Sequence, residues 1–104
     1  MMKSLYKYIL DEDTGNITVR EITEYRVKEN EFTHRKTYIH KDRYGTVYTR
    51  EESFDQLKHN IVYSFDSDIL HAKSIIMNNV KIRRAKAKRE YERWNGVFEK
   101  LRRD

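Results

Sequence analysis

The last third of the chain, residues 66–102, has the pattern of one long helix, and this feature most limits what the chain can fold into. Its apolar side chains recur at steps of three and four residues, which is the signature of one helical face. The positions of this stripe are Ile69, Ala72, Ile76, Val80, Ala87, Tyr91, Trp94, Phe98 and Leu101.

The length of this predicted helix exceeds that of any small sheet beneath it. About 36 residues at ~1.5 Å each span roughly 54 Å, whereas a sheet of short strands is only ~20 Å long. Part of the helix must therefore overhang the sheet, fold back on itself or meet a partner. Two sites could interrupt it, Asn78-Asn79 and Asn95-Gly96.

Three signals agree on where the helix starts. Asp66 is the predicted N-cap, and Asp68 falls in the first turn, where the helix dipole favours a carboxylate. Phe65 before the cap and Leu70 after it have the spacing of a hydrophobic staple.

The preceding part, residues 1–65, reads as β-structure. Aromatic and aliphatic residues predict a strand from Ser4 to Leu10, and a polar turn follows from Asp11 to Asn16, where Gly15 or Asn16 can take a positive φ. Residues 17–27 alternate between apolar and polar side chains, so we expect one strand that forms a hairpin with the first.

The chain then continues with shorter elements. A third strand is predicted from Phe32 to His40 and a fourth from Thr46 to Arg50. Residues 53–56 fit a capping box, which predicts a short helix from residue 54 to about residue 59, followed by an extended stretch over residues 61–65. The expected fold class is therefore α+β: a single domain, residues 1–104, with an antiparallel meander of about four strands, a short helix and a long C-terminal helix.

The composition excludes several classes of function. Apolar and charged residues each make up 38% of the chain, enough for one thin core but not for a deep enclosed pocket. Without cysteine there are no disulfides, thiolate zinc sites or cysteine nucleophiles. We find no signal peptide and no apolar run of ~20 residues, so we expect a cytoplasmic protein.

The net charge of +5 is concentrated in residues 81–93. This basic segment alone has a net charge of +5, and the other residues contain 15 basic and 15 acidic side chains. A local basic excess indicates an anionic partner, while the alternative is a solubilising helix surface whose arginine stems cover the sheet. The candidate partner-binding or nucleic-acid-binding residues are Lys81, Arg83, Arg84, Lys86, Lys88, Arg89 and Arg93.

Large apolar residues follow the basic segment at helical spacing: Tyr91, Trp94, Phe98 and Leu101. Such a stripe is more often core that packs on a sheet. The alternative is a helix–helix interface that makes a homodimer, since this end of the helix can overhang.

No pattern predicts a reaction. His34 and His40 share one strand face but lie about 20 Å apart at ~3.3 Å per residue, too far for one metal ion. The acidic pairs, such as Asp66 and Asp68, have complete explanations as turn or cap residues. We therefore predict no catalytic residue, no metal site and no cofactor, and a protein that is not an enzyme.

Three stretches resemble small accessory proteins of bacteriophages and mobile elements. They are Met-Lys-Ser-Leu-Tyr-Lys-Tyr at residues 2–8, Asp-Thr-Gly-Asn-Ile at residues 13–17, and Tyr-Ser-Phe-Asp-Ser-Asp-Ile-Leu-His-Ala-Lys at residues 63–73. These motifs are turn and cap residues, so they mark a fold and transfer no site. Proteins of this kind and size are often inhibitors of host defence, anti-CRISPR proteins among them. The resemblance thus implies a binding protein in a bacterial host cell.

Three functions follow, in order of preference. The first is a phage-type inhibitor of a nucleic-acid-handling defence complex, which acts through the basic helix on a protein or nucleoprotein with an acidic or phosphate surface. Because this chain is basic, mimicry of DNA is disfavoured. The second is a direct DNA- or RNA-binding accessory or regulatory protein, and the third is a structural dimerisation module.

Overall fold

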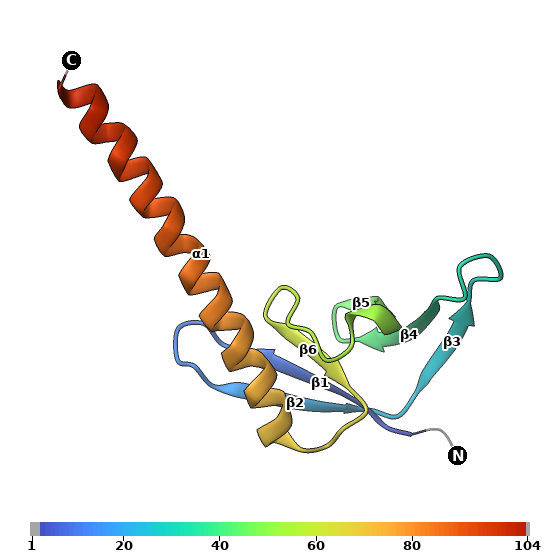
Figure 1. The fold of residues 1–104 in the computed structure, drawn as a ribbon. Coiled ribbons are helices and arrows are strands. Elements are labelled where there is room, and N and C mark those ends of the chain that lie inside the picture. The colour runs from blue at the N-terminus through green and yellow to red at the C-terminus, as the bar shows by residue number, and fades with distance from the viewer. Residues whose placement is uncertain (1–2, 104) are drawn as a thin grey trace.

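The computed structural model describes residues 3–103 and has the expected α+β class, with two small antiparallel sheets and one long C-terminal helix (Figure 1). The prediction of a single meander of about four strands was wrong, because residues 3–103 form six strands divided equally between the two sheets. The sheets have the orders β2-β1-β6 and β3-β4-β5.

The first sheet is built on the predicted N-terminal hairpin. β1 (Leu5–Leu10) pairs with β2 (Ile17–Ile22) on one side and with β6 (Ile61–Ser64) on the other. The connecting turn is the predicted one: Gly15 has a φ of 75°, and the Asp11 carboxylate accepts the backbone N–H of Asp13. Residues from opposite ends of the β-rich part thereby share one sheet.

The strand predicted over residues 17–27 is instead two strands in different sheets. It breaks at residues 23–24, and β3 (Tyr25–Glu29) opens the second sheet with β4 (Lys36–Asp42) and β5 (Gly45–Arg50). The residue that marks the break is Ile22, which lies out of phase with the apolar positions before and after it and packs on the core between the sheets. In one straight strand Ile22 would point to the face opposite Ile17 and Tyr25, so the three side chains could not share one buried face.

The start of the third predicted strand was also misplaced. Phe32 lies in the turn before β4 and is 93% exposed. The turn forms because the Asn30 side chain accepts the backbone N–H groups of Phe32 and Thr33, and His34 takes a positive φ of 55°. Side-chain hydrogen bonds of this kind favour turns over strand pairing.

The short helix predicted from residue 54 does not form. A single 3₁₀ turn, Glu51–Ser53, stands nearby, and the Ser53 hydroxyl donates to the Arg50 carbonyl oxygen (2.7 Å) instead of capping a helix. Phe54 is extended, forms an isolated bridge with Tyr63 and packs its ring 4.9 Å from that of Tyr38. Tertiary packing of this ring outweighs the local capping signal.

Two core clusters hold the body together. One lies between the first sheet and the helix and is formed by Tyr8, Leu57, Val62, Ala72 and Ile76. The other is largely aromatic and joins the two sheets through Leu5, Tyr25 and Tyr38, with Phe54, Tyr63 and Phe65 against them. The hydroxyls of two buried rings are satisfied by backbone: Tyr8 donates to the Asp66 carbonyl and Tyr25 to that of Lys3.

The C-terminal helix α1 (Ile69–Arg103) is continuous, so neither asparagine site interrupts it. Its cap is Asp68, whose carboxylate accepts the N–H of Leu70 (2.9 Å), while Asp66 forms the turn before it by accepting the N–H of Asp68 (2.9 Å). The predicted cap was therefore two residues early. The staple is absent too, because Leu70 is 71% exposed and Phe65 packs between the sheets.

The molecule is much more extended than a compact domain of its length. Its radius of gyration is 18.7 Å and its longest dimension 67 Å, against about 13 Å for the radius of gyration of a compact 100-residue domain. Figure 1 shows the reason: only the first part of α1 covers the first sheet, and the rest projects away from the body.

Candidate binding arm of the C-terminal helix

Helix α1 leaves the body near Arg83. Ala72 and Ile76 are its buried residues, and one turn beyond Asn79 the Arg83 guanidinium donates to the Asn60 side-chain oxygen and to the Leu57 carbonyl, both at 3.4 Å. Residues 84–103, which we call the arm, are exposed throughout except for the half-buried Glu99. About 20 residues at ~1.5 Å each make the arm roughly 30 Å long.

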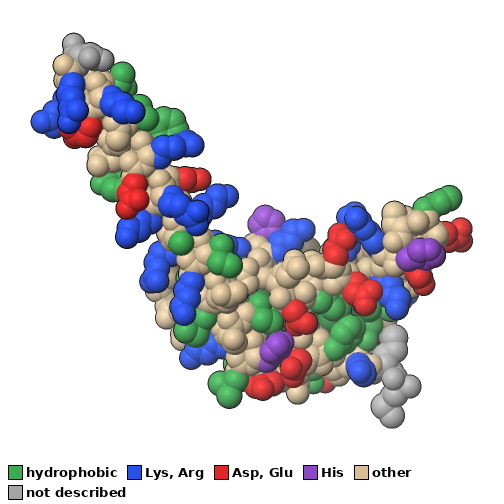
Figure 2. All heavy atoms as spheres, viewed as in Figure 1, with side chains coloured by type: hydrophobic (Ala, Val, Ile, Leu, Met, Phe, Trp, Pro, Cys, Tyr) green, Lys and Arg blue, Asp and Glu red, His purple; other side chains and the backbone are tan. Residues whose placement is uncertain are grey.

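The predicted basic residues lie at the base of the arm and along it, and all seven are exposed. Because successive helical residues are separated by 100°, these cations point in several directions around the axis. Figure 2 shows Lys and Arg side chains on both visible edges of the projecting helix. Arg83 differs from the rest, since it is hydrogen-bonded to the body and helps to hold the helix there.

The charge of the molecule is divided between the helix and the sheets. Residues 69–103 contain 11 basic and three acidic side chains, a net charge of +8, and the remaining residues contain 11 basic and 14 acidic ones, a net charge of −3. Residues 81–89, the basic waist, contain six Lys or Arg and no acidic residue. The structure thus carries its positive field on the element that projects from it.

The aromatic end of the helix is not part of the core. Tyr91, Trp94, Phe98 and Leu101 are 58–72% exposed, so the interpretation of this stripe as core was wrong. The sheets end too early to cover it, as Figure 1 shows. A cation lies on one of these rings: the Arg93 guanidinium is 5.0 Å from the centre of the Trp94 ring, which is cation–π range.

A buried polar cluster at the junction of the two sheets escaped the sequence analysis. Lys7 from β1 forms an ion pair with Asp42 from β4, and both side chains are about nine-tenths buried. Beside them His40 is 2% exposed, and neither of its ring nitrogens has a hydrogen-bond partner among the described residues. Only the contact between the two sheets brings β1 and β4 together, although the shared parity of His40 and Asp42 on one strand hinted at a common face.

The pKa values in this cluster follow from burial and charge. Burial lowers the pKa of His40, and the neighbouring Lys7 ammonium lowers it further. The hydrogen bond from Lys7 lowers the pKa of Asp42. His40 is therefore held neutral at pH 7, and the Lys7–Asp42 ion pair links β1 of the first sheet to β4 of the second.

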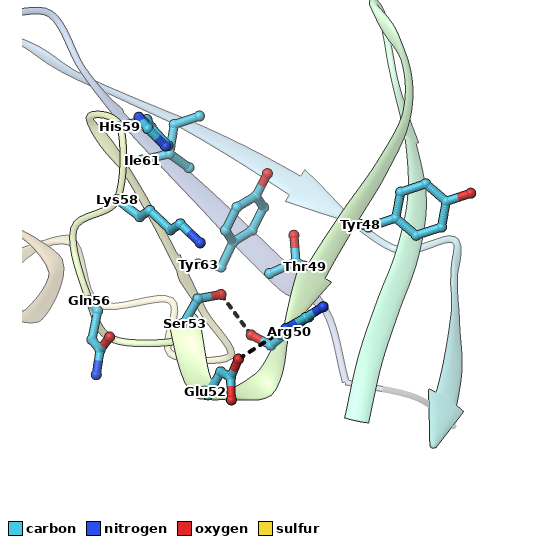
Figure 3. A pocket seen from close by; sticks show the side chains of 10 residues that line it. All are labelled: Tyr48, Thr49, Arg50, Glu52, Ser53, Gln56, Lys58, His59, Ile61 and Tyr63. Carbon is cyan, nitrogen blue, oxygen red and sulfur yellow. Dashed lines mark hydrogen bonds and ion pairs between the residues drawn. The ribbon is translucent and has the colours of Figure 1, made fainter. Parts of the chain in front are cut away.

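An open cleft of about 790 Å³ lies between β5 and the segment that leads into β6 (Figure 3). Tyr63 and Thr49 lie close to each other in it, whereas Tyr48 extends away from them. Lys58 and His59 lie on the turn whose backbone holds Arg83, so the cleft adjoins the base of the arm. Arg50 at the far side is paired with Glu52 at 3.6 Å.

Residues 3–103 contain no group of three or more histidine, aspartate or glutamate side chains arranged to hold a metal ion. None of the helices described there has the length and apolar character needed to span a membrane.

Comparison with known proteins found no match: no family model, no curated protein and no solved structure is significantly similar to this chain.

Proposed function

We propose that this protein is a non-enzymatic binding protein of phage type that inhibits a nucleic-acid-handling defence complex in the cytoplasm of a bacterial host. Its arm engages the nucleic acid of that complex. The observation that carries the proposal is the basic waist: six cations with no acidic residue among them, exposed around a helix that projects from a body of opposite net charge.

The chemistry of the waist suits phosphate. Arginine presents a planar fork of donors that matches phosphate geometry, and lysine adds mobile point charges. Each neutralised phosphate releases about one counterion, so binding is strong at low salt and weakens steeply as salt rises. A single helix with its side chains is about 10–12 Å wide, which is close to the ~12 Å width of the DNA major groove. The arm can thus enter a groove that the wider body cannot.

A second candidate is direct binding of free DNA or RNA, as an accessory or regulatory protein. It is favoured by the distribution of the cations around the helix, because a protein surface would engage one face of the helix, whereas nucleic acid can follow several. Direct binding predicts high affinity for free DNA or RNA, without any protein of a defence complex.

The test reverses four charges in the waist and leaves the body intact. Arg83 is excluded because it holds the helix on the Leu57 carbonyl, and the substitutions are Arg84→Glu, Lys86→Glu, Lys88→Glu and Arg89→Glu. The matched control makes the same change in net charge on the second sheet, at exposed positions: Arg26→Glu, Lys28→Glu, Lys36→Glu and Lys41→Glu.

Binding is measured by fluorescence anisotropy with labelled DNA and RNA, single-stranded and duplex, across a salt series. We expect the waist variant to lose affinity by on the order of 100- to 1,000-fold and the salt slope to fall by about three to four. The control variant loses much less. Equal losses in the two variants would show that only net charge matters and would overturn the assignment to the waist.

Inhibition is assayed separately, with reconstituted nucleic-acid-targeting defence complexes. Inhibition that the wild type and the control show and the waist variant lacks supports the first function. Tight binding to free nucleic acid without inhibition supports the second. Absence of binding to any nucleic acid at low salt removes both.

A further inference from the structure

The exposed apolar residues of the arm follow the repeat of a coiled coil. Ala87, Tyr91, Trp94, Phe98 and Leu101 are separated by alternating steps of four and three residues. A period of 3.5 residues keeps a narrow seam on one side of a helix that faces another helix, whereas packing on a sheet needs no such strict alternation. We call these five residues the seam.

The seam has no partner within the body. Neither core cluster of the described residues includes a seam residue, and the four large ones are each more than half exposed. The arm also contains Asn95 and Gly96, which weaken an unsupported helix. A helical segment of this length that lacks tertiary packing is marginal in water, so the arm requires stabilisation by packing of its apolar face.

Charge separates the seam from the waist. Residues 90–101 contain three glutamates against Arg93 and Lys100, a net charge of −1, whereas the adjoining waist has a net charge of +6. An anionic partner is attracted to the waist and gains nothing at the nearly neutral seam. A second copy of this seam, in contrast, can approach without net repulsion, and its heptad spacing is complementary to itself.

We propose that a second copy of this chain covers the four large residues of the seam, Tyr91, Trp94, Phe98 and Leu101, with the two arms antiparallel and centred near Gly96. In a parallel pair the two waists would lie side by side. Arg84, which continues the heptad spacing three residues before Ala87, would then face Arg84 of the second copy. An antiparallel pair separates the centres of the waists by about 22 residues, or ~33 Å, which exceeds the screening length of ~8–10 Å in physiological salt.

The antiparallel arrangement also matches the order of charges along the arm. Acidic Glu90 and Glu92 precede Gly96, and basic Lys100 and Arg102 follow it. Reversal about Gly96 brings residue 90 level with residue 102 of the second copy, and residue 92 level with residue 100. In a parallel pair each of these charges would lie level with its own copy instead.

The pair is expected to be reversible. Three aromatic residues and one leucine on each arm bury on the order of 1,000 Å² in total, which is the lower end of specific interfaces. Contacts of this size are typical of weak or transient association. This inference does not rest on the proposed function: a dimer can form whether or not the waist binds nucleic acid.

The oligomeric state is tested by sedimentation velocity on the full chain over a wide concentration range. We expect the mass to rise from monomer to dimer with concentration, and the double variant Trp94→Glu/Phe98→Glu to remain monomeric. Its matched control, Ala85→Glu/Gly96→Glu, adds the same charge on the opposite face of the arm, where a side chain at residue 96 meets no atom within 4 Å, and should still dimerise. Circular dichroism confirms that both variants keep the body folded.

The orientation is tested with single cysteines, since the chain has none of its own. In an antiparallel pair Tyr91→Cys lies opposite Leu101→Cys, so a short bismaleimide should link a mixture of the two variants and neither variant alone. Linkage within each single variant would establish a parallel pair. A monomeric wild type at every concentration, or loss of the dimer in the Ala85→Glu/Gly96→Glu control as well, would overturn the assignment of the seam.

Discussion

The two halves of α1 are one continuous helix with similar side-chain periodicity, yet they have opposite environments. In the docked half, residues 69–83, Ala72 and Ile76 are buried against the first sheet. In the arm, residues of greater apolar area, such as Trp94 and Phe98, are exposed. An apolar stripe therefore predicts which face of a helix will be covered, but not which surface will cover it.

The charge differs between the halves as well. The docked half has a net charge of +3 and the arm +5, and the waist spans the point where the helix leaves the body. Cations along a docked helix are restricted to its outer side, whereas the arm can present them in every direction. The arm, which contributes least to the core, is thus the half of the helix whose cations are most accessible.

The largest effect is expected from removing the side chain that docks the helix. Ile76→Ala deletes a nearly fully buried side chain that packs with Tyr8 and Val62. We expect the free energy of unfolding to fall by about 2–4 kcal/mol, from lost burial and the cavity left behind. Urea denaturation followed by circular dichroism measures the change.

The matched control for this variant is Ile82→Ala, which makes the same chemical change just before the arm, where the side chain is 58% exposed. We expect a change within about 0.5 kcal/mol. Similar losses in the two variants would show that the two halves of the helix are packed alike, contrary to the structure.

Acidification should weaken the body of the protein. Because burial and Lys7 lower the pKa of His40 below its ordinary value of 6.5, unfolding takes up a proton once the pH falls below that value. Stability is therefore complete above about pH 6.5 and declines as the pH falls toward the lowered pKa, by at most about 1.4 kcal/mol per pH unit. Asp42 causes a second loss of stability at lower pH. Its pKa in the folded protein is also lowered, so this loss begins only when the pH falls below the ordinary pKa of 3.8.

The measurement is the urea midpoint as a function of pH for the wild type, His40→Gln and His71→Gln. The groups that face His40 are Lys7, Asp42 and the Tyr63 ring. We expect the decline below pH 6.5 to flatten in the His40 variant and to persist when the exposed His71 is replaced. A decline that persists in both variants would assign it to another group.

The smallest effect is expected from strengthening the arm alone. Gly96→Ala adds a methyl group that meets no atom within 4 Å and favours the helix by about 1 kcal/mol. We expect a small gain in helical ellipticity and no change in the urea midpoint of the body. The only tryptophan, Trp94, lies in the arm, so its fluorescence reports this half separately, and a shifted body midpoint would show that the halves unfold together.

Much of the local structure could be predicted from the sequence. The β1–β2 hairpin follows from the polar turn with Gly15, and the long helix follows from its stripe and its acidic start. The errors lie where a local signal competed with packing. Ser53 has the spacing of a cap, but Phe54 gains more by packing against Tyr38 and Phe65 than a short helix would provide.

The candidate site was predicted as a set of residues but not as a surface. The seven basic residues were identified from charge alone, yet the sequence could not show that Arg83 bonds to the body while Arg84 and its successors project freely. The contact of Lys7 with His40 and Asp42 could not be predicted, since Lys7 lies more than 30 positions from both in the sequence.

The sequence by itself determined the α+β class, the helical stripe of the last third and the concentration of positive charge in residues 81–93, because periodicity and charge are local properties. The structure decided that the helix begins after Asp68 and runs through both asparagine sites without a break. Only the tertiary structure decided that the chain splits into two sheets after Ile22 and that the sheets end beneath the middle of α1. Which surface covers a stripe depends on contacts between distant residues, and here those contacts stop at Arg83. The arm is what remains when a helix of 35 residues is longer than the sheet on which it docks.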